Sequence, residues 1–206
     1  GACGGGGGGS DTGQSIVAPQ PSVPTNQLVS LTRYTGPTKT FQKIDLMMPA
    51  NGILDFSLIG TRVRLFDSTM KLVGESSYTP GTTYQVNLMA GAYIVEYEYW
   101  SANSRDAVAY SPTLLAFGNL PQLKNAVYSS GDNTTTYYRA SFATSSRVDV
   151  SGSGAYIDIL DANMKMVNTM GSSYSPVTLP AGDYIFKIMF SSSNARSVSI
   201  TSPGLP

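Results

Sequence analysis

The amino-acid sequence contains one long internal repeat, and this repeat constrains the fold more than any other feature. Residues 63–99 resemble residues 157–190. The matched residues lie 94 positions apart in the first part of the repeat and 91 apart in the second, as in Asp67/Asp161, Met70/Met164, Lys71/Lys165, Gly91/Gly182, Tyr93/Tyr184, Arg105/Arg196 and Pro112/Pro203. Such a repeat is too long for a solenoid or propeller unit and close in size to a small sandwich domain. The sequence therefore predicts two tandem copies of one domain.

The recurring residues predict tight turns and strands. Asp67 and Asp161 each end a short alternating run, where an Asp side chain can accept hydrogen bonds from the backbone of a turn. Gly91 and Gly182 predict hairpins in which φ is positive, because glycine adopts that conformation without steric cost. In the strand that follows each glycine, alternate residues form an apolar face that we expect in the core: Tyr93, Val95, Tyr97, Tyr99 and Tyr184, Phe186, Ile188, Phe190. The opposite face mixes charged and apolar residues and is expected to contact water or a partner: Ile94, Glu96, Glu98, Trp100 and Ile185, Lys187, Met189, Ser191.

No window shows helical periodicity, and Gly, Pro, Ser, Thr and Asn are too frequent for helices of ordinary length. The predicted fold is therefore all-β, with two tandem, jelly-roll-like β-sandwich domains over residues 26–118 and 119–206. The segment between the copies is too apolar for a free linker. Either its apolar residues pack between the two domains, or the segment supplies the last strand of one domain and the first of the next; these residues are Leu114, Leu115, Phe117 and Leu120.

Four motifs follow one another in the first copy: a Pro/Asn/Gly turn at residues 49–52, the alternating residues Leu54, Phe56 and Leu58, the run VRLFD at 63–67, and VNLMAGAY at 86–93. The second copy offers ILD at 159–161 and LPAGDY at 179–184. This order resembles the bacterial pre-peptidase C-terminal domain over about residues 27–112 and 124–203. The resemblance implies a jelly-roll-like sandwich. It also implies a module that binds carbohydrate, protein or a surface, and in that family such modules usually accompany a secreted enzyme.

The N-terminus, GACGGGGGG, contains the one cysteine of the chain, Cys3, so no intrachain disulfide can form. Its small residues before the cysteine resemble the end of a bacterial lipoprotein signal, which implies an acylated Cys3, carrying for example palmitate. Residues 1–25 are poor in apolar side chains and predict a flexible tether. Gly4 after the cysteine implies sorting to an outer membrane, facing the periplasm or the cell surface. The alternative is an incidental thiol in a remnant of cloning.

The composition argues against several function classes. The chain has 13 Lys plus Arg and 13 Asp plus Glu, so it offers no basic field for nucleic acid. It has no histidine, which removes the commonest general base and metal ligand. Turn chemistry explains the acids at Asp67, Asp161 and Asp132 better than calcium does. We therefore expect no enzyme activity, no cofactor and no metal.

One exposed cluster is a candidate binding site. Trp100 lies at the end of a predicted strand beside Glu96 and Glu98, and a polar loop leads on to Arg105. A tryptophan in this setting can stack on a sugar ring or anchor a protein partner. The alternative is a tryptophan that folds back over the edge of the sandwich. Because Arg105 recurs as Arg196, a structural role within each domain is favoured for this arginine.

These observations predict a non-enzymatic envelope lipoprotein, held at a membrane by its lipid anchor, that acts as a binding or assembly module for other envelope or surface components. The expected partner is a protein, with polysaccharide as a further possibility. The alternatives are a carbohydrate-binding surface protein and an adhesin or filament subunit whose strand edges pair between chains.

Overall fold

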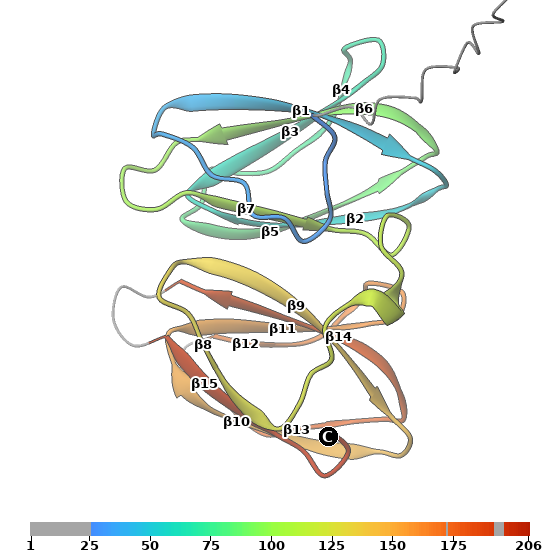
Figure 1. Cartoon of the computed structure of the whole chain (residues 1–206), viewed down its shortest axis with the longest axis vertical. Helices are drawn as coiled ribbons and strands as arrows, with labels where there is room; N and C mark the ends of the chain where they lie inside the picture. Colours follow the sequence, from blue (N-terminus) through green and yellow to red (C-terminus); the bar gives the residue numbers. More distant parts are fainter. Residues whose placement is uncertain (1–25, 172, 192–195) are drawn as a thin grey trace, which may run out of the picture.

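The computed structural model describes residues 26–171, 173–191 and 196–206, so Cys3 and the expected tether lie outside the described residues. Within them the chain forms strands β1 to β15 and one short 3-10 helix, η1 (Phe117–Asn119), and no α-helix. The prediction of an all-β, sandwich-like fold is confirmed. Figure 1 shows two sandwiches stacked along the long axis of the molecule, each made of two sheets.

The first sandwich contains strands β1 to β7. Its outer sheet has the order β1-β6-β3-β4 and its inner sheet the order β5-β2-β7, with antiparallel pairing throughout. The strands are β1 (Thr40–Met48), β2 (Gly52–Ile59), β3 (Thr61–Asp67), β4 (Leu72–Glu75), β5 (Gly81–Leu88), β6 (Gly91–Tyr99) and β7 (Asp106–Tyr110).

The second sandwich contains strands β8 to β15. Its sheets have the orders β12-β11-β14-β9 and β13-β10-β15-β8. The strands are β8 (Ala126–Ser129), β9 (Thr134–Phe142), β10 (Ser146–Ser153), β11 (Ala155–Asp161), β12 (Met166–Met170), β13 (Val177–Leu179), β14 (Gly182–Phe190) and β15 (Ser197–Thr201). The topology therefore repeats as the sequence does, with β3, β6 and β1 matching β11, β14 and β9. In the first sandwich the counterpart of β8 is reduced to an isolated bridge between Tyr34 and Ala107.

The repeated motifs have the predicted local structures. Asp67 Oδ1 accepts hydrogen bonds from the backbone N–H groups of Thr69 (2.9 Å) and Lys71 (3.0 Å), and Asp161 Oδ1 makes the same pair of bonds in the second copy. Gly91 and Gly182 have φ values of 144° and 150°. These turns are confirmed, and they fix the hairpins that lead into β6 and β14.

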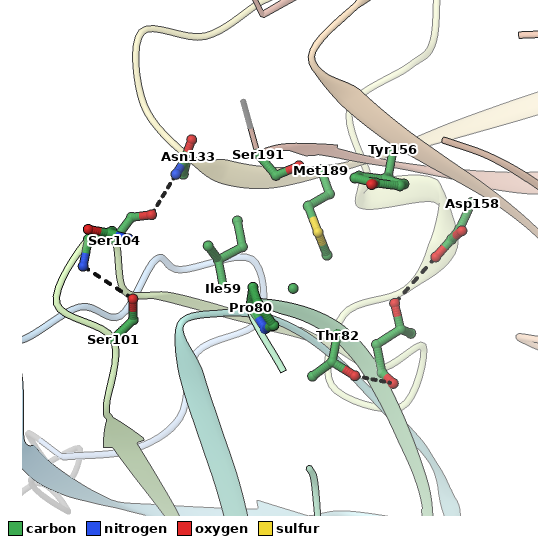
Figure 2. Close-up of a pocket in the computed structure, with 13 residues that line it drawn as sticks. Ile59, Pro80, Thr82, Ser101, Ser104, Asn133, Tyr156, Asp158, Met189 and Ser191 are labelled. Carbon is green, nitrogen blue, oxygen red and sulfur yellow. Dashed lines mark hydrogen bonds between the residues drawn. The ribbon is translucent and has the colours of Figure 1, made fainter. Parts of the chain in front are cut away.

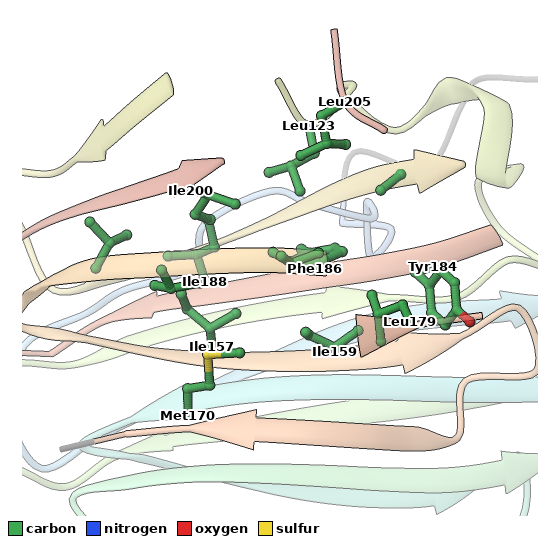
Figure 3. Close-up of a cluster of buried hydrophobic side chains, with 14 of the residues drawn as sticks. Leu123, Ile157, Ile159, Met170, Leu179, Tyr184, Phe186, Ile188, Ile200 and Leu205 are labelled. Carbon is green, nitrogen blue, oxygen red and sulfur yellow. The ribbon is translucent and has the colours of Figure 1, made fainter. Parts of the chain in front are cut away.

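Each sandwich has its own apolar core. The predicted core face of β6 and β14 is confirmed, because its members are buried apart from the half-buried Tyr93. In the second core, Phe186 and Ile188 of β14 meet Ile157 and Ile159 of β11 and Ile200 of β15 (Figure 3). Burial of alternate side chains from two facing sheets explains why period-2 sequences form this fold.

The two sandwiches pack sheet against sheet, with β5-β2-β7 of the first against β12-β11-β14-β9 of the second (Figure 1). A third apolar cluster lies there and combines residues of both: Val108, Tyr110, Leu120, Tyr137, Leu160, Met164 and Ile185. From the linker, Leu115 and Phe117 pack on this cluster together with the buried Leu120, whereas Leu114 packs in the first core. Residues 113–125 contain no strand and β8 begins only at Ala126, so the first of the two interpretations holds for Leu115, Phe117 and Leu120, which pack between the sandwiches.

The repeat explains why the stack involves these two sheets. The inner sheet of the first sandwich presents Ile53, Val108 and Tyr110 to the interface. At the equivalent positions, 94 or 91 residues later, the β13-β10-β15-β8 sheet of the second sandwich carries Arg147, Ser199 and Thr201. Apolar side chains favour burial of a sheet face against another domain, and polar side chains favour exposure of the face to water. The first sheet therefore lies in the interface and its counterpart in the second sandwich faces solvent.

Candidate functional site

The interface between the sandwiches contains a buried ion pair. Lys187 on β14 and Asp55 on β2 have side chains that are 1% and 0% exposed, and Lys187 Nζ lies 2.9 Å from Asp55 Oδ2. The ammonium also donates to Phe56 O (3.3 Å) and Thr83 Oγ1 (3.2 Å). All its donors are therefore used, which is the condition under which a buried charge is tolerated.

The Asp55 carboxylate receives two further hydrogen bonds. Tyr137 Oη donates to Oδ2 (2.6 Å), and Gln85 Nε2 donates to Oδ1 (2.9 Å) while also bonding to Met164 O (3.0 Å). Burial, and then the neighbouring Asp55 carboxylate, raise the pKa of Tyr137 well above its usual value, so this phenol stays protonated as a donor. This polar network connects β2 and β5 of the first sandwich to β9 and β14 of the second.

The outer face of the β1-β6-β3-β4 sheet carries two of the predicted site residues. Glu96 is buried to 6% exposure and pairs with Arg64. Glu98 accepts a hydrogen bond from Tyr78 Oη (2.7 Å) and lies 3.7 Å from Arg62. These acids and arginines therefore neutralise each other in rows across the sheet.

Apolar side chains surround those rows. Phe41 and Met47 of β1 are 57% and 53% exposed, and they share this face with the half-buried Ile94 and Phe66. The ring of Trp100 is half-buried and meets Tyr78 edge to face at 6.2 Å between centroids. Trp100 thus folds against the end of this face and does not project from it.

Arg105 is separate from these residues. Its Nε donates to Gly36 O (2.7 Å) and one terminal nitrogen donates to Ser101 O (2.7 Å). In the second copy Arg196 likewise donates to a backbone oxygen, of Gly131 (2.6 Å). Both guanidinium groups therefore tie loops together within their own sandwich, and Arg105 adds no free donor to the outer face.

A cleft of about 870 Å³ opens between the sandwiches at one side of their interface (Figure 2). One wall consists of the end of β2, the start of β5 and the loops before β5 and β7 in the first sandwich, and the other of residues from β11 and the end of β14 with the turn before β9. Sequence reasoning did not identify this cleft, because its residues come from segments far apart in the chain. The one local signal was an outward-facing tyrosine, Tyr156, beside Gly171, which directly follows strand β12.

Across residues 26–171, 173–191 and 196–206, no three Asp, Glu or Cys side chains are grouped in a way that could hold a metal ion. Within the same ranges, no helix has the length and apolar character needed to cross a membrane.

Comparisons with known proteins add little. No family model matches the chain, and no curated protein matches it. Among solved structures, the crystal structure of Tripeptidyl Peptidase 2 (TPP II) aligns with 82% of this chain at a TM-score of 0.28 and 9% identity. The chain spans 22% of that protein, and a similarity this low supports no argument about function.

Proposed function

We propose that this protein is a non-enzymatic envelope lipoprotein that acts as a binding or assembly module, with the outer face of the β1-β6-β3-β4 sheet as its docking surface for another envelope protein. An acylated Cys3 would hold it at the outer membrane. The resemblance to the pre-peptidase C-terminal domain, a family of binding modules, supports the same role.

One observation carries the proposal: the equivalent face of the second sandwich is already a docking surface. There Ile185 and Lys187 are each 1% exposed, because they pack on the first sandwich. Their counterparts 91 positions earlier are Ile94 and Glu96 on the outer face. This outer face keeps the apolar character of a contact surface, with Phe41 and Met47 exposed.

Charge at the equivalent positions favours a different protein over a second copy of this chain. Lys187 docks on Asp55, and the counterpart of Asp55 in the second sandwich is Asp149. A head-to-tail stack of two chains would therefore place Glu96 opposite Asp149. Glu96 and Asp149 are each paired with an arginine of their own sandwich, so neither supplies the complementary charge that Lys187 supplies to Asp55, and like charges are unfavourable in an interface. The filament alternative is therefore disfavoured.

The test is site-specific photo-crosslinking in native cells. A photoreactive residue at Phe41 should give one discrete adduct, and the same residue at Val127, 67% exposed on the opposite end of the molecule, should not. Met47→Asp should abolish the adduct, whereas Val127→Asp should leave it unchanged. Mass spectrometry of the adduct should identify an envelope protein and an acylated Cys3.

Equal cross-linking from both positions, or none from either, would refute the docking surface. An adduct with a second copy of this chain would refute the argument from charge, and an unmodified Cys3 would refute the lipid anchor.

A further inference from the structure

The cleft between the sandwiches is framed by two hydrogen bonds that join its walls. Asn133 Nδ2 of the second sandwich donates to Ser104 Oγ of the first (2.5 Å), and Thr83 Oγ1 of the first lies 3.3 Å from Asp158 Oδ2 of the second. Figure 2 shows these contacts at opposite ends of the opening. These bonds fix the position of one wall relative to the other, so the cleft has a defined shape before a ligand binds. Such preorganisation lowers the entropic cost of binding.

The chemistry of the lining excludes several ligand classes. Among the described residues no Lys or Arg lines the cleft, so they offer no cationic group for a phosphate or carboxylate ligand. Apart from the Met189 and Ile59 side chains and Pro80, its walls consist mainly of hydroxyl and amide groups. A volume of about 870 Å³ lies within the roughly 300–1,000 Å³ of typical ligand sites. This lining suits a neutral ligand that carries many hydroxyl groups.

An aromatic ring is already positioned in this cleft. Tyr156 is 52% exposed on β11, and its ring lies on Gly171. A Cβ atom at Gly171 would come within 2.6 Å of the ring carbon Cε1, so only glycine leaves room for the ring in this position. Contact with the glycine backbone supports the ring from one side and leaves about half of the side chain exposed, where it can pack on an apolar surface.

A carboxylate lies two residues further along the same strand. Asp158 Oδ1 accepts a hydrogen bond from Thr169 Oγ1 (2.7 Å), and Oδ2 accepts the bond from Thr83. Thr83 Oγ1 in turn accepts from Lys187 Nζ (3.2 Å), which orients its hydroxyl hydrogen toward Asp158. A carboxylate can accept about four hydrogen bonds, so about two remain for hydroxyl groups of a ligand.

We propose that the cleft between the two sandwiches binds a neutral oligosaccharide, with Tyr156 stacked on the apolar face of one sugar ring and Asp158 accepting hydrogen bonds from its hydroxyl groups. The exposed Asn103 and the serine and threonine hydroxyls of the lining supply further donors and acceptors. Of the described residues that line the cleft, Asp158 alone carries a carboxylate, whereas glycoside hydrolysis ordinarily uses two. The site therefore binds the sugar without cleaving it. This site is independent of the proposed docking face on the outer sheet.

Isothermal titration of the full chain with soluble hexasaccharides tests the proposal. The probes are cellohexaose, maltohexaose and the hexamer of N-acetylglucosamine, with hexagalacturonate as an anionic comparison. We expect saturable binding of at least one neutral probe and none of the anionic probe. Tyr156→Ala should weaken that binding by about tenfold, since an aromatic contact contributes up to about 1.5 kcal/mol beyond its buried area.

Tyr78→Ala is the matched control. Tyr78 is 53% exposed, almost the same as Tyr156, but it lies on the outer face of the first sandwich and does not line the cleft. Binding should survive this change. Asp158→Asn, which keeps the shape of the side chain and replaces one acceptor oxygen by a donor, should also weaken binding. The proposal fails if no neutral probe saturates at millimolar concentration, or if Tyr156→Ala and Tyr78→Ala have equal effects.

Discussion

The buried pair of Lys187 and Asp55 allows a sharp test of how the sandwiches are joined. Lys187→Met removes the charge and keeps a side chain of similar length. Asp55 then remains a carboxylate with 0% exposure, and its remaining side-chain donors are the neutral Tyr137 and Gln85. Breaking a buried ion pair from one side costs about 3–5 kcal/mol. Because those two hydrogen bonds persist, we expect a loss of about 3 kcal/mol, a large share of the roughly 5–15 kcal/mol that stabilises a typical protein.

The repeat supplies the control for this experiment. Asp149 is the counterpart of Asp55 and pairs with Arg147 at 3.0 Å, but the two side chains are 48% and 63% exposed. Exposed pairs contribute about 0–1 kcal/mol, so Asp149→Asn should have little effect. The double variant Asp55→Asn/Lys187→Met removes both buried charges and should recover much of the loss.

Urea unfolding measures these differences, with two probes. Fluorescence of Trp100, the one tryptophan, reports on the first sandwich, and circular dichroism reports on both. The two curves should coincide for the wild-type chain and separate for Lys187→Met, because the weakened interface lets the sandwiches unfold independently. A loss below about 1 kcal/mol for Lys187→Met, equal to that for Asp149→Asn, would refute the reasoning.

Two further predictions concern the first sandwich. Burial raises the pKa of Asp106 to about 6 from 3.8, despite its ion pair with Arg33. The folded state therefore holds this proton more tightly than the unfolded state does. The stability that the protonated carboxyl confers, roughly 2–3 kcal/mol, is present at low pH and lost as pH rises through about 6. Asp106→Asn should flatten the pH dependence of the urea midpoint between pH 4 and 7, and an unchanged slope would contradict this. The Tyr97 hydroxyl is buried with no hydrogen-bonding partner among the described residues, whereas Tyr99 Oη donates to Gln42 Oε1 at 2.6 Å. Tyr97→Phe should therefore raise the free energy of unfolding by about 1 kcal/mol, and Tyr99→Phe should lower it by a similar amount. If thermal unfolding showed that Tyr97→Phe destabilises the protein more than Tyr99→Phe does, this account of the two hydroxyl groups would be contradicted.

The sequence was sufficient to predict the sandwich fold because the fold depends on local periodicity. Alternation along β6 and β14 identified the core face, and the Asp67 and Asp161 motifs identified their turns. Periodicity does not reveal which of two equivalent outward faces docks. Glu96 and Lys187 occupy the same position in the repeat, yet one faces away from the molecule and the other meets Asp55 across the interface. That difference depends on contacts between residues more than 100 positions apart, which a single strand does not encode.

The candidate sites were harder to predict for a related reason. Glu96 and Glu98 do share a face, as strand geometry requires, but their charges are neutralised by Arg64 and Arg62. The cleft residues are ordinary turn and edge residues when taken one by one. These residues come together only because the two sandwiches stack, so no sequence motif in either copy predicts the cleft.

The cleft has walls from both sandwiches, and this links ligand affinity to the docking of the domains. A molecule that contacts both walls binds the docked arrangement in preference to a separated one, so it acts as a clamp. By the same linkage, any change that loosens the joint should weaken binding even when the changed residue never touches the ligand. Lys187 illustrates this, since its ammonium orients Thr83 toward Asp158 from beneath the cleft. The duplication of one sandwich would then have had a consequence beyond a second copy of the fold. It would have created a binding cleft at the interface, which neither sandwich can form alone.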